Sequence, residues 1–178
     1  RKAGHFDPQG LANLAWAFAT LQEEHAPLFD CLGDVFARDP ARWQPQNVAN
    51  LVWAFAKRPV AHPRLLDAAA GEAAATVDSW NGQGLANVAW AYAKLGCAQY
   101  RRLFDRVAAA VVQRISTFTP QNTVNIAWAF VKLGVAGRGL LGAIAGHVAA
   151  RAGDFSPQHC SSAAWAFGAA GRLDEAAM

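Results

Sequence analysis

The feature that most constrains this chain is a segment of twelve residues that occurs five times, at residues 11–22, 48–59, 85–96, 123–134 and 160–171. Each copy carries one tryptophan at the same place, and successive tryptophans are 37, 37, 38 and 37 residues apart. These residues are Trp16, Trp53, Trp90, Trp128 and Trp165. A fixed period of this length is typical of stacked helical repeats, in which no unit can bury its apolar face alone.

We therefore predict an all-α fold, an α-solenoid of about five two-helix repeats of 37–38 residues that forms a single array over residues 1–178. The repeats are predicted at 6–42, 43–79, 80–117, 118–154 and, for a partial fifth, 155–178. Alanine supplies much of the 53% hydrophobic content, which favours closely packed helices. No uninterrupted run of 18 apolar residues occurs, so no membrane span is expected. The start at Arg1, in mid-repeat, predicts a processed or truncated piece without its targeting segment.

Each unit begins with an aromatic residue, then a residue that in four of the five units is a good helix N-cap, and then Pro or Gly. The aromatic residues are Phe6, Trp43, Trp80, Phe118 and Phe155. Proline fits the first helical turn because its missing N–H would have no partner there, and the aromatic can pack on the fourth helical residue. The pattern predicts five inner helices of about fourteen residues, ending near the Leu-Gly pairs at 95–96 and 133–134.

A helical wheel of the third inner helix separates an apolar face from a partly polar one. The apolar face holds Leu85, Val88 and Tyr92, and the partly polar face, which we expect to point outward, holds Gln83, Asn87, Trp90 and Lys94. A more variable second helix follows in each unit, with an apolar side and a charged side, and is expected to form an outer layer. Because the chain stops inside the second helix of the fifth unit, we expect nine full helices and a fragment.

The fourth repeat reads F-x-P-Q-x-x-x-N-x-A-W-A-F-x-K-L-G and resembles the octotricopeptide repeat, a two-helix unit of similar length. The residues that carry the pattern are Phe118, Pro120, Gln121, Asn125, Ala127, Trp128, Ala129, Phe130, Lys132, Leu133 and Gly134. The resemblance covers essentially the whole chain. Departures occur at Gly82, Ser162 and Ala170, and no RAP domain, a frequent C-terminal partner in that family, follows.

This resemblance implies two kinds of role. Most members of the family are organelle-targeted proteins of algae and related protists that bind single-stranded RNA and govern its maturation, stability or translation. They imply a non-catalytic protein that binds single-stranded or structured RNA in a plastid or mitochondrion. Similar repeats in organellar ribosomes and other large assemblies imply instead a scaffold subunit that docks on proteins of a ribosome or membrane complex. RNA and other proteins are then the expected partners, with no cofactor, metal or small-molecule substrate.

Helical-repeat readers bind roughly one base per repeat through side chains that differ between units. One position near the start of the inner helices varies, and we predict base contacts there by Asn47, Asn122 and His159. A nearby asparagine recurs in four units and cannot encode different bases, so we expect it to form a structural hydrogen-bonded ladder between units. Its copies are Asn13, Asn50, Asn87 and Asn125.

The five tryptophans can serve in two ways. A ring that stacks on a base contributes about 1–3 kcal/mol, whereas burying a ring of about 200 Å² contributes up to about 5 kcal/mol. Since burial contributes more and alanines flank every tryptophan, we expect a structural ladder of tryptophans packed between repeats. Base stacking is the alternative.

Basic residues concentrate in the third and fourth units, where residues 94–151 carry a net charge of +7 against +3 for the whole chain. The predicted phosphate contacts are Lys94, Arg101, Arg102, Arg106, Arg114 and Lys132. An acidic protein partner would fit the same patch. Lys57, Lys94 and Lys132 are also explained by their position at helix C-termini, where a cation interacts favourably with the helix dipole.

Motifs for catalysis or metal binding are weak. Gly137, Gly139 and Gly142 form a lone G-x-G-x-x-G, but it follows a helix and not a strand, so we interpret it as a flexible turn. The three cysteines and five histidines show neither a disulfide pattern nor metal-ligand spacing. Cys160 takes the place of Leu11 in its unit and is expected to be buried. We therefore predict that the protein is not an enzyme.

Overall fold

The computed structural model describes residues 7–176, with side chains described as far as residue 171, and this part of the chain forms nine α-helices and no strand. The helices are α1 (Pro8–Leu21), α2 (Ala26–Arg38), α3 (Pro45–Lys57), α4 (Pro63–Thr76), α5 (Gly82–Lys94), α6 (Arg101–Arg114), α7 (Pro120–Lys132), α8 (Arg138–Ala150) and α9 (Pro157–Ala176). A single 3-10 turn follows each of α2, α4, α6 and α8. Phe6, the predicted first aromatic, lies outside the described residues.

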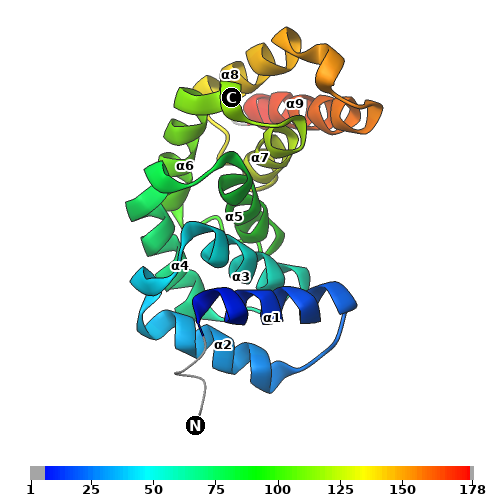
Figure 1. Ribbon diagram of the computed structural model, residues 1–178. Coiled ribbons are helices and arrows are strands. Elements are labelled where there is room, and N and C mark those ends of the chain that lie inside the picture. Colours follow the sequence, from blue (N-terminus) through cyan, green and yellow to red (C-terminus); the bar gives the residue numbers. More distant parts are fainter. Residues whose placement is uncertain (1–6, 177–178) are drawn as a thin grey trace.

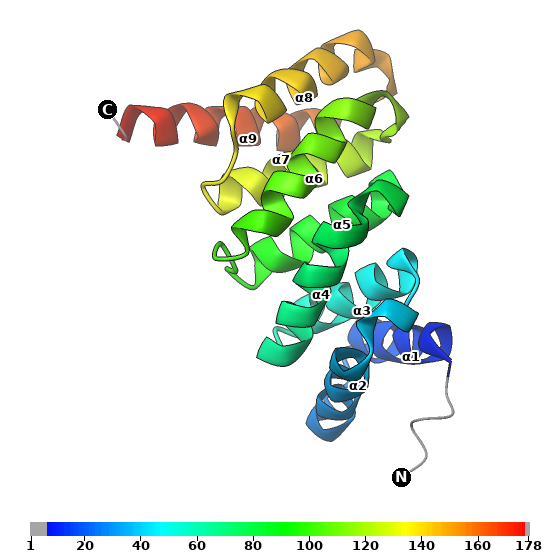
Figure 2. The same cartoon turned by 90° about the vertical axis from the view of Figure 1, so that its left-hand side faces the viewer.

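The helices form two layers. Odd-numbered helices pack one against the next from α1 to α9, and even-numbered helices do the same from α2 to α8. Figure 1 shows a curved stack with α4, α6 and α8 along its outer edge and the odd-numbered helices on the inner side. Figure 2 shows the outer layer from the front. The predicted α-solenoid is thereby confirmed, and its inner surface belongs to the odd-numbered helices.

The predicted starts of the inner helices are confirmed. Four of them begin at proline and α5 begins at Gly82. The side-chain oxygens of Asp7, Asn81, Thr119 and Ser156 each accept a hydrogen bond from the backbone N–H three residues further on, at 2.7–3.3 Å. These bonds satisfy N–H groups that the first helical turn leaves without a partner. The starts of four inner helices are therefore fixed by local side-chain caps, whereas Gln44 before α3 makes no such bond and α3 begins at Pro45 alone.

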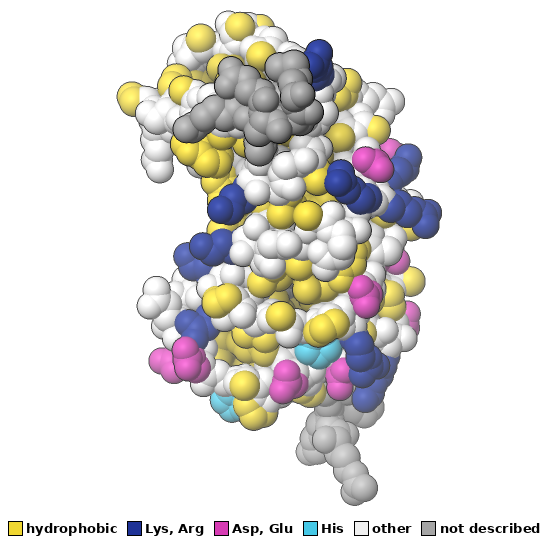
Figure 3. Space-filling view, turned by 180° about the vertical axis from the view of Figure 1, so that it is seen from behind, with side chains coloured by type: hydrophobic (Ala, Val, Ile, Leu, Met, Phe, Trp, Pro, Cys, Tyr) yellow, Lys and Arg dark blue, Asp and Glu magenta, His cyan; other side chains and the backbone are white. Residues whose placement is uncertain are grey.

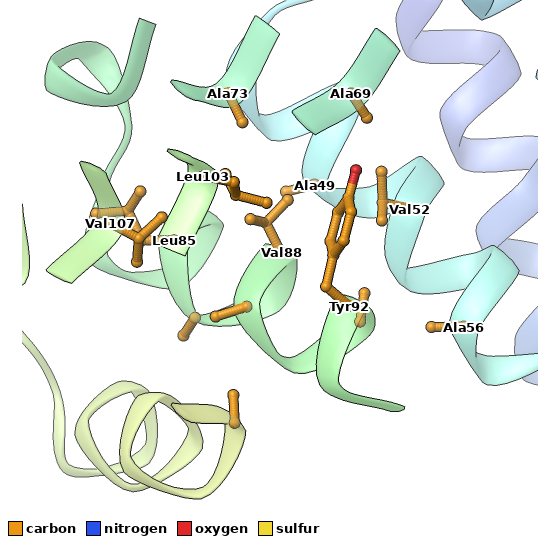
Figure 4. Packing of buried hydrophobic residues seen from close by; sticks show 14 of the residues in the cluster. Ala49, Val52, Ala56, Ala69, Ala73, Leu85, Val88, Tyr92, Leu103 and Val107 are labelled. Atoms are coloured by element: carbon orange, nitrogen blue, oxygen red, sulfur yellow. The ribbon is translucent and has the colours of Figure 1, made fainter. Parts of the chain in front are cut away.

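The core lies where each inner helix meets the preceding unit. Leu85, Val88 and Tyr92, the predicted apolar face of α5, are all completely buried. Figure 4 shows the Tyr92 ring pointing from α5 toward Val52 of α3 and Ala69 of α4. Its hydroxyl donates a 2.6 Å hydrogen bond to the backbone carbonyl of Leu66. One side chain therefore contacts both helices of the preceding unit.

Arginines on the outer layer bind backbone carbonyls in the connections between successive units. The Arg114 guanidinium donates to the carbonyls of Val77, Asp78 and Trp80 at 3.1–3.2 Å. These carbonyls lie in the connection between α4 and α5, and that of Val77 also accepts a hydrogen bond from the backbone N–H of Trp80 at 3.2 Å. Arg151 donates to the carbonyl of Phe118, in the connection between α6 and α7, at 3.2 Å. Each arginine thus ties the end of its outer helix to the connection that precedes the inner helix of its repeat.

Two expectations about the last unit are wrong. Cys160 is exposed and not buried, because no unit covers this side of α9 in the described residues. The predicted break between the fifth inner helix and a fragment of a second helix is absent from the described chain, since α9 runs without interruption to Ala176. In two earlier units, Gly96 and Gly134 end the helix with φ of 71° and 66°, whereas Gly171 lies within α9.

The glycine cluster near α8 also differs from its interpretation as a flexible turn. Gly137 is the N-cap of α8, but Gly139 and Gly142 lie inside the helix. The motif thus supplies no phosphate-binding loop. None of the helices in the part of the chain described by the structure has the length and apolar character needed to cross a membrane.

Candidate nucleic-acid interface

The inner surface carries the same three side chains in each of three successive repeats. We call these sets the inner rows: Asn50, Trp53 and Lys57 on α3; Asn87, Trp90 and Lys94 on α5; and Asn125, Trp128 and Lys132 on α7. Residues three, four and seven apart lie on one face of a helix, so each row follows its helix axis. Because α3, α5 and α7 pack side by side, the rows form a continuous surface of amide, indole and ammonium groups.

The tryptophans of the inner rows form a ladder of rings. The centroids of Trp53 and Trp90 are 6.3 Å apart with planes inclined by 29°, and those of Trp90 and Trp128 are 6.4 Å apart and inclined by 31°. All three rings are half-buried, so one side of each packs against protein and the rest faces solvent. These three rings thus pack across repeats while each remains partly exposed.

The terminal tryptophans are more exposed than the repeat pattern predicts. Trp16 is 48% exposed and Trp165 is 46% exposed. Among the described rings, the ladder does not extend to either of them. Burial therefore does not account for tryptophan at all five positions, and a surface role remains open for this residue type.

The lysines of the inner rows lie one turn beyond the tryptophans. Lys57, Lys94 and Lys132 are exposed in the last turn of their helices. The Lys57 ammonium lies 5.9 Å from the centre of the Trp53 ring. Lys57 was absent from the predicted phosphate contacts, although its spacing of four residues from Trp53 is visible in the sequence. The same spacing puts Lys94 and Lys132 one helical turn beyond Trp90 and Trp128.

A pocket of about 230 Å³ opens at the junction of α5, α7 and α9. Its walls include the indoles of Trp90 and Trp128, and its rim carries the polar groups of Gln121, Asn125 and Gln158. Val124, His159 and Ser162 complete the lining. The pocket lies at the end of the tryptophan ladder, where Ser162 stands in place of the asparagine found in the other units. We call it the junction pocket.

A directed chain of hydrogen bonds crosses the rim of the junction pocket. The backbone N–H of Ser156 donates to Nδ1 of His159 at 3.3 Å, so the ring proton is on Nε2. His159 Nε2 then donates to Gln121 Oε1 at 3.2 Å, and Gln121 Nε2 donates to Asn125 Oδ1 at 2.8 Å. This order assigns both amide orientations. The NH₂ group of Asn125 is the end of the chain.

The three predicted base-contacting residues do not share one environment. His159 lines the junction pocket. Asn122 is half-buried, and its amide lies against Gly82 of the preceding unit, where an added Cβ would be 3.3 Å from Nδ2. Asn47 is half-buried at the start of α3. The structure therefore brings only His159 of this set into contact with the inner rows.

The predicted phosphate-binding residues divide between two surfaces. Lys94 and Lys132 lie on the inner rows, whereas Arg101, Arg102, Arg106 and Arg114 lie on outer helix α6. Figure 3 shows Lys and Arg side chains along both edges of the molecule. Arg106 donates to the Ala74 carbonyl and to Asp78 at 3.2 Å each, and Arg114 binds the backbone as described above. Two of the four arginines thus have structural partners.

The predicted asparagine ladder is half-buried in its central members and exposed at Asn13. The described hydrogen bonds of this ladder are those around Asn125, within the fourth unit and from it to the fifth. Gln121, Gln158 and Ser162 were not predicted as site residues. Their spacing of four residues within a helix, glutamine followed by asparagine or serine, is the signal that could have identified them.

Comparison with known proteins adds a family. The model of the RNA-editing substrate-binding complex 6 protein family matches residues 1–169, which is nearly the whole chain. No curated protein matches the chain.

Proposed function

Because the chain belongs to the family of RNA-editing substrate-binding complex 6 proteins, we propose that it is a non-catalytic subunit of an RNA-editing complex that holds single-stranded RNA along the inner rows. The observation that carries this proposal is the ladder of Trp53, Trp90 and Trp128 with an exposed lysine one helical turn beyond each ring. Aromatic platforms combined with cations are the usual means of binding single-stranded nucleic acid.

The repetition of identical residues suits binding that tolerates sequence. Every base has a flat face, so a row of indoles accepts any base at about 1–3 kcal/mol each. Lysines along the same line neutralise the phosphates that follow the bases. Identical rows on α3, α5 and α7 therefore support binding of the RNA strand whatever its base sequence, rather than recognition of particular bases. The outer arginines Arg101 and Arg102 contribute less, because they lie on the opposite layer.

We test this proposal at Trp90, the central ring of the ladder. In Trp90→Leu an apolar side chain remains but the platform is lost, so affinity for an unstructured RNA octamer should fall about 5- to 150-fold. Trp16→Leu is the matched control, because Trp16 holds the same repeat position but lies outside the ladder. The affinity of this variant for the octamer should stay within about twofold of wild type. Fluorescence anisotropy measures both, and thermal unfolding checks that both variants are folded.

Equal affinities for wild type and folded Trp90→Leu would contradict binding on the ladder. If wild type binds no RNA octamer in the micromolar range at physiological salt, the inner rows do not bind RNA and a protein ligand becomes the leading account of this surface.

A scaffold role is a second candidate, and one observation favours it. An apolar groove of about 530 Å³ lies between α6 and α8, lined by Phe104, Phe130 and Leu140 among others, with Val112 45% exposed at its edge. Exposed grooves of this kind often bind protein partners. Val112→Glu should then release the chain from its complex, measured by co-sedimentation, while the RNA affinity of the purified chain is unchanged. Unchanged co-sedimentation would remove the groove from consideration.

Placement in a plastid or mitochondrion rests on the resemblance to octotricopeptide repeats and is also part of the proposal. Imaging of the tagged, full-length natural protein in its own cells tests it. Signal throughout the cytosol would contradict an organellar role.

A further inference from the structure

The junction pocket differs from the rest of the inner surface, because hydrogen bonds between the side chains on its rim fix which groups donate and which accept. His159 stands where the other units have Gly10, Asn47, Gly84 and Asn122, so the chain of bonds described above depends on the residue at this variable position. In the chain, each acceptor oxygen of Gln121 and Asn125 is already occupied by a donor from its neighbour. At the end of this chain of bonds, Asn125 therefore offers its amide N–H group to a ligand.

The size and lining of the pocket suit a small, flat, neutral group. A volume of about 230 Å³ corresponds to roughly seven or eight water molecules at about 30 Å³ each. Its lining combines two indoles with amides and a hydroxyl, and it contains no Lys, Arg, Asp or Glu. A charged ligand would find no counterion inside. Lys132 lies one helical turn beyond Trp128, so a phosphate attached to the occupant would meet a cation outside the pocket.

We propose that the junction pocket binds one base of the RNA strand, stacked on Trp128, and that Asn125 Nδ2 donates to a carbonyl oxygen on the edge of that base. Uracil O4 and guanine O6 are such carbonyl oxygens, whereas cytosine and adenine carry an amino group at the matching place, which is itself a donor. The pocket thereby adds selectivity for uracil and guanine at one point of a surface that otherwise tolerates sequence. This inference rests on the proposed RNA-binding function.

Inosine and adenosine provide the sharpest comparison. Both bases are purines and present similar rings to Trp128, but inosine has a carbonyl oxygen where adenosine has an amino group. We would measure, by fluorescence anisotropy, the affinity of wild type for an adenosine octamer and for an octamer of alternating adenosine and inosine. One net hydrogen bond predicts that the inosine-containing octamer binds about three- to tenfold more tightly. A uridine octamer tests whether the carbonyl oxygen of a pyrimidine base is bound in the same way.

Two substitutions of one residue give opposite expectations. Asn125→Ala removes the donor, so the ratio of the two affinities should fall to about one. Asn125→Asp replaces the donor with an acceptor, so the ratio should reverse in favour of adenosine, even though the added charge weakens binding of both octamers. Asn13→Ala is the matched control: it removes the equivalent asparagine in the first unit, outside the inner rows, and should leave the ratio unchanged.

The outcomes separate this inference from the proposed function. If wild type binds both octamers equally well, or if folded Asn125→Ala keeps the preference, the pocket does not read a carbonyl although RNA binding stands. If wild type binds neither octamer, the proposed function and this inference both fail. A preference that disappears in Asn125→Ala and reverses in Asn125→Asp is the result that we expect.

Discussion

Arg114 has a structural role that its position in the repeat does not predict. Its guanidinium binds three carbonyls in the connection between α4 and α5, and hydrogen bonds to a charged group contribute about 1.5–3 kcal/mol. We therefore expect Arg114→Ala to lower the free energy of unfolding by about that amount in urea denaturation. Arg102→Ala, on the exposed side of the same helix, should change it by less than about 0.5 kcal/mol. Similar effects of the two substitutions would contradict the structural role of Arg114.

Tyr92 links two units and makes their stability depend on pH. Burial raises the pKa of its phenol well above the usual value of 10, because the ionised form would lose its hydration. The unfolded chain releases this proton from about pH 10 upward, while the folded chain retains it. The folded state then binds more protons, so the free energy of unfolding falls as the pH rises beyond 10.

Tyr92→Phe isolates this effect. At pH 7 the variant loses the hydrogen bond to Leu66 and should be less stable by about 1 kcal/mol. At pH 11 ionisation of Tyr92 in the unfolded chain weakens wild type by about 1.4 kcal/mol for the one unit above the phenol's unfolded pKa. The variant lacks this contribution, while Tyr100, whose phenol pKa is also raised, weakens both proteins. The difference should therefore vanish or reverse between urea denaturation at pH 7 and at pH 11. A difference that is the same at both pH values would show that Tyr92 does not titrate in the unfolded chain alone.

At the scale of single residues, local roles could be predicted and distant ones could not. The caps Asp7, Asn81, Thr119 and Ser156 each bond to a group three residues away, so composition and spacing suffice to identify them. Arg114 binds carbonyls 34–37 residues away, and its flexible side chain could point to solvent, to a phosphate or to the preceding unit. Only the packing of α6 on α4 decides between these.

At the scale of helices, two glycines should respond in opposite ways to alanine. Gly96 ends α5 with a φ of 71°, a conformation that costs an L-residue about 1–2 kcal/mol. Gly71 lies inside α4, and an added Cβ would meet no side chain and no other packed element within 4 Å. We expect Gly96→Ala to lower the free energy of unfolding by about 1 kcal/mol and Gly71→Ala to raise it by about 0.5–1 kcal/mol. Thermal unfolding would contradict this account if both shifts had the same sign.

Helix starts were more predictable than helix ends. A cap and a proline stop a helix from extending backward whatever surrounds it. Gly171, in contrast, stands where Gly96 and Gly134 end their helices, yet α9 continues through it. Glycine permits the left-handed turn but does not impose it. In the earlier units the chain must turn back to pack its outer helix, and that tertiary demand is not visible in the glycine itself.

At the scale of the whole molecule, each unit is stabilised by its neighbours, so equivalent residues should differ with their place in the array. Leu14 and Leu51 occupy the same repeat position, but Leu14 is 39% exposed on α1 and Leu51 is completely buried on α3. Leu51→Ala should lower the free energy of unfolding by about 2–5 kcal/mol. Leu14→Ala should lower it by less than about 1 kcal/mol. Equal losses would mean that α1 is covered in solution, for example by a second copy.

The candidate site was predictable only in part. The wheel placed Asn87, Trp90 and Lys94 on one face of α5, and the structure has them on the inner surface. That surface separates Lys94 and Lys132 from the arginines of α6, a division that a charge count over residues 94–151 cannot detect. The junction pocket also depends on how α9 meets α7, which the period of the repeat leaves undetermined.

The central claim is that RNA lies on the inner rows, and its salt dependence tests this most directly. We would measure the affinity of an RNA octamer from 50 to 300 mM salt for wild type, for Lys57→Gln/Lys94→Gln/Lys132→Gln and for Arg101→Gln/Arg102→Gln. Each lost phosphate contact on a single strand reduces the slope of log affinity against log salt by about 0.7. The account predicts a slope reduced by about two units in the lysine variant and unchanged in the arginine variant. A slope reduced by the arginine substitutions alone would place the RNA on the outer layer and contradict the account.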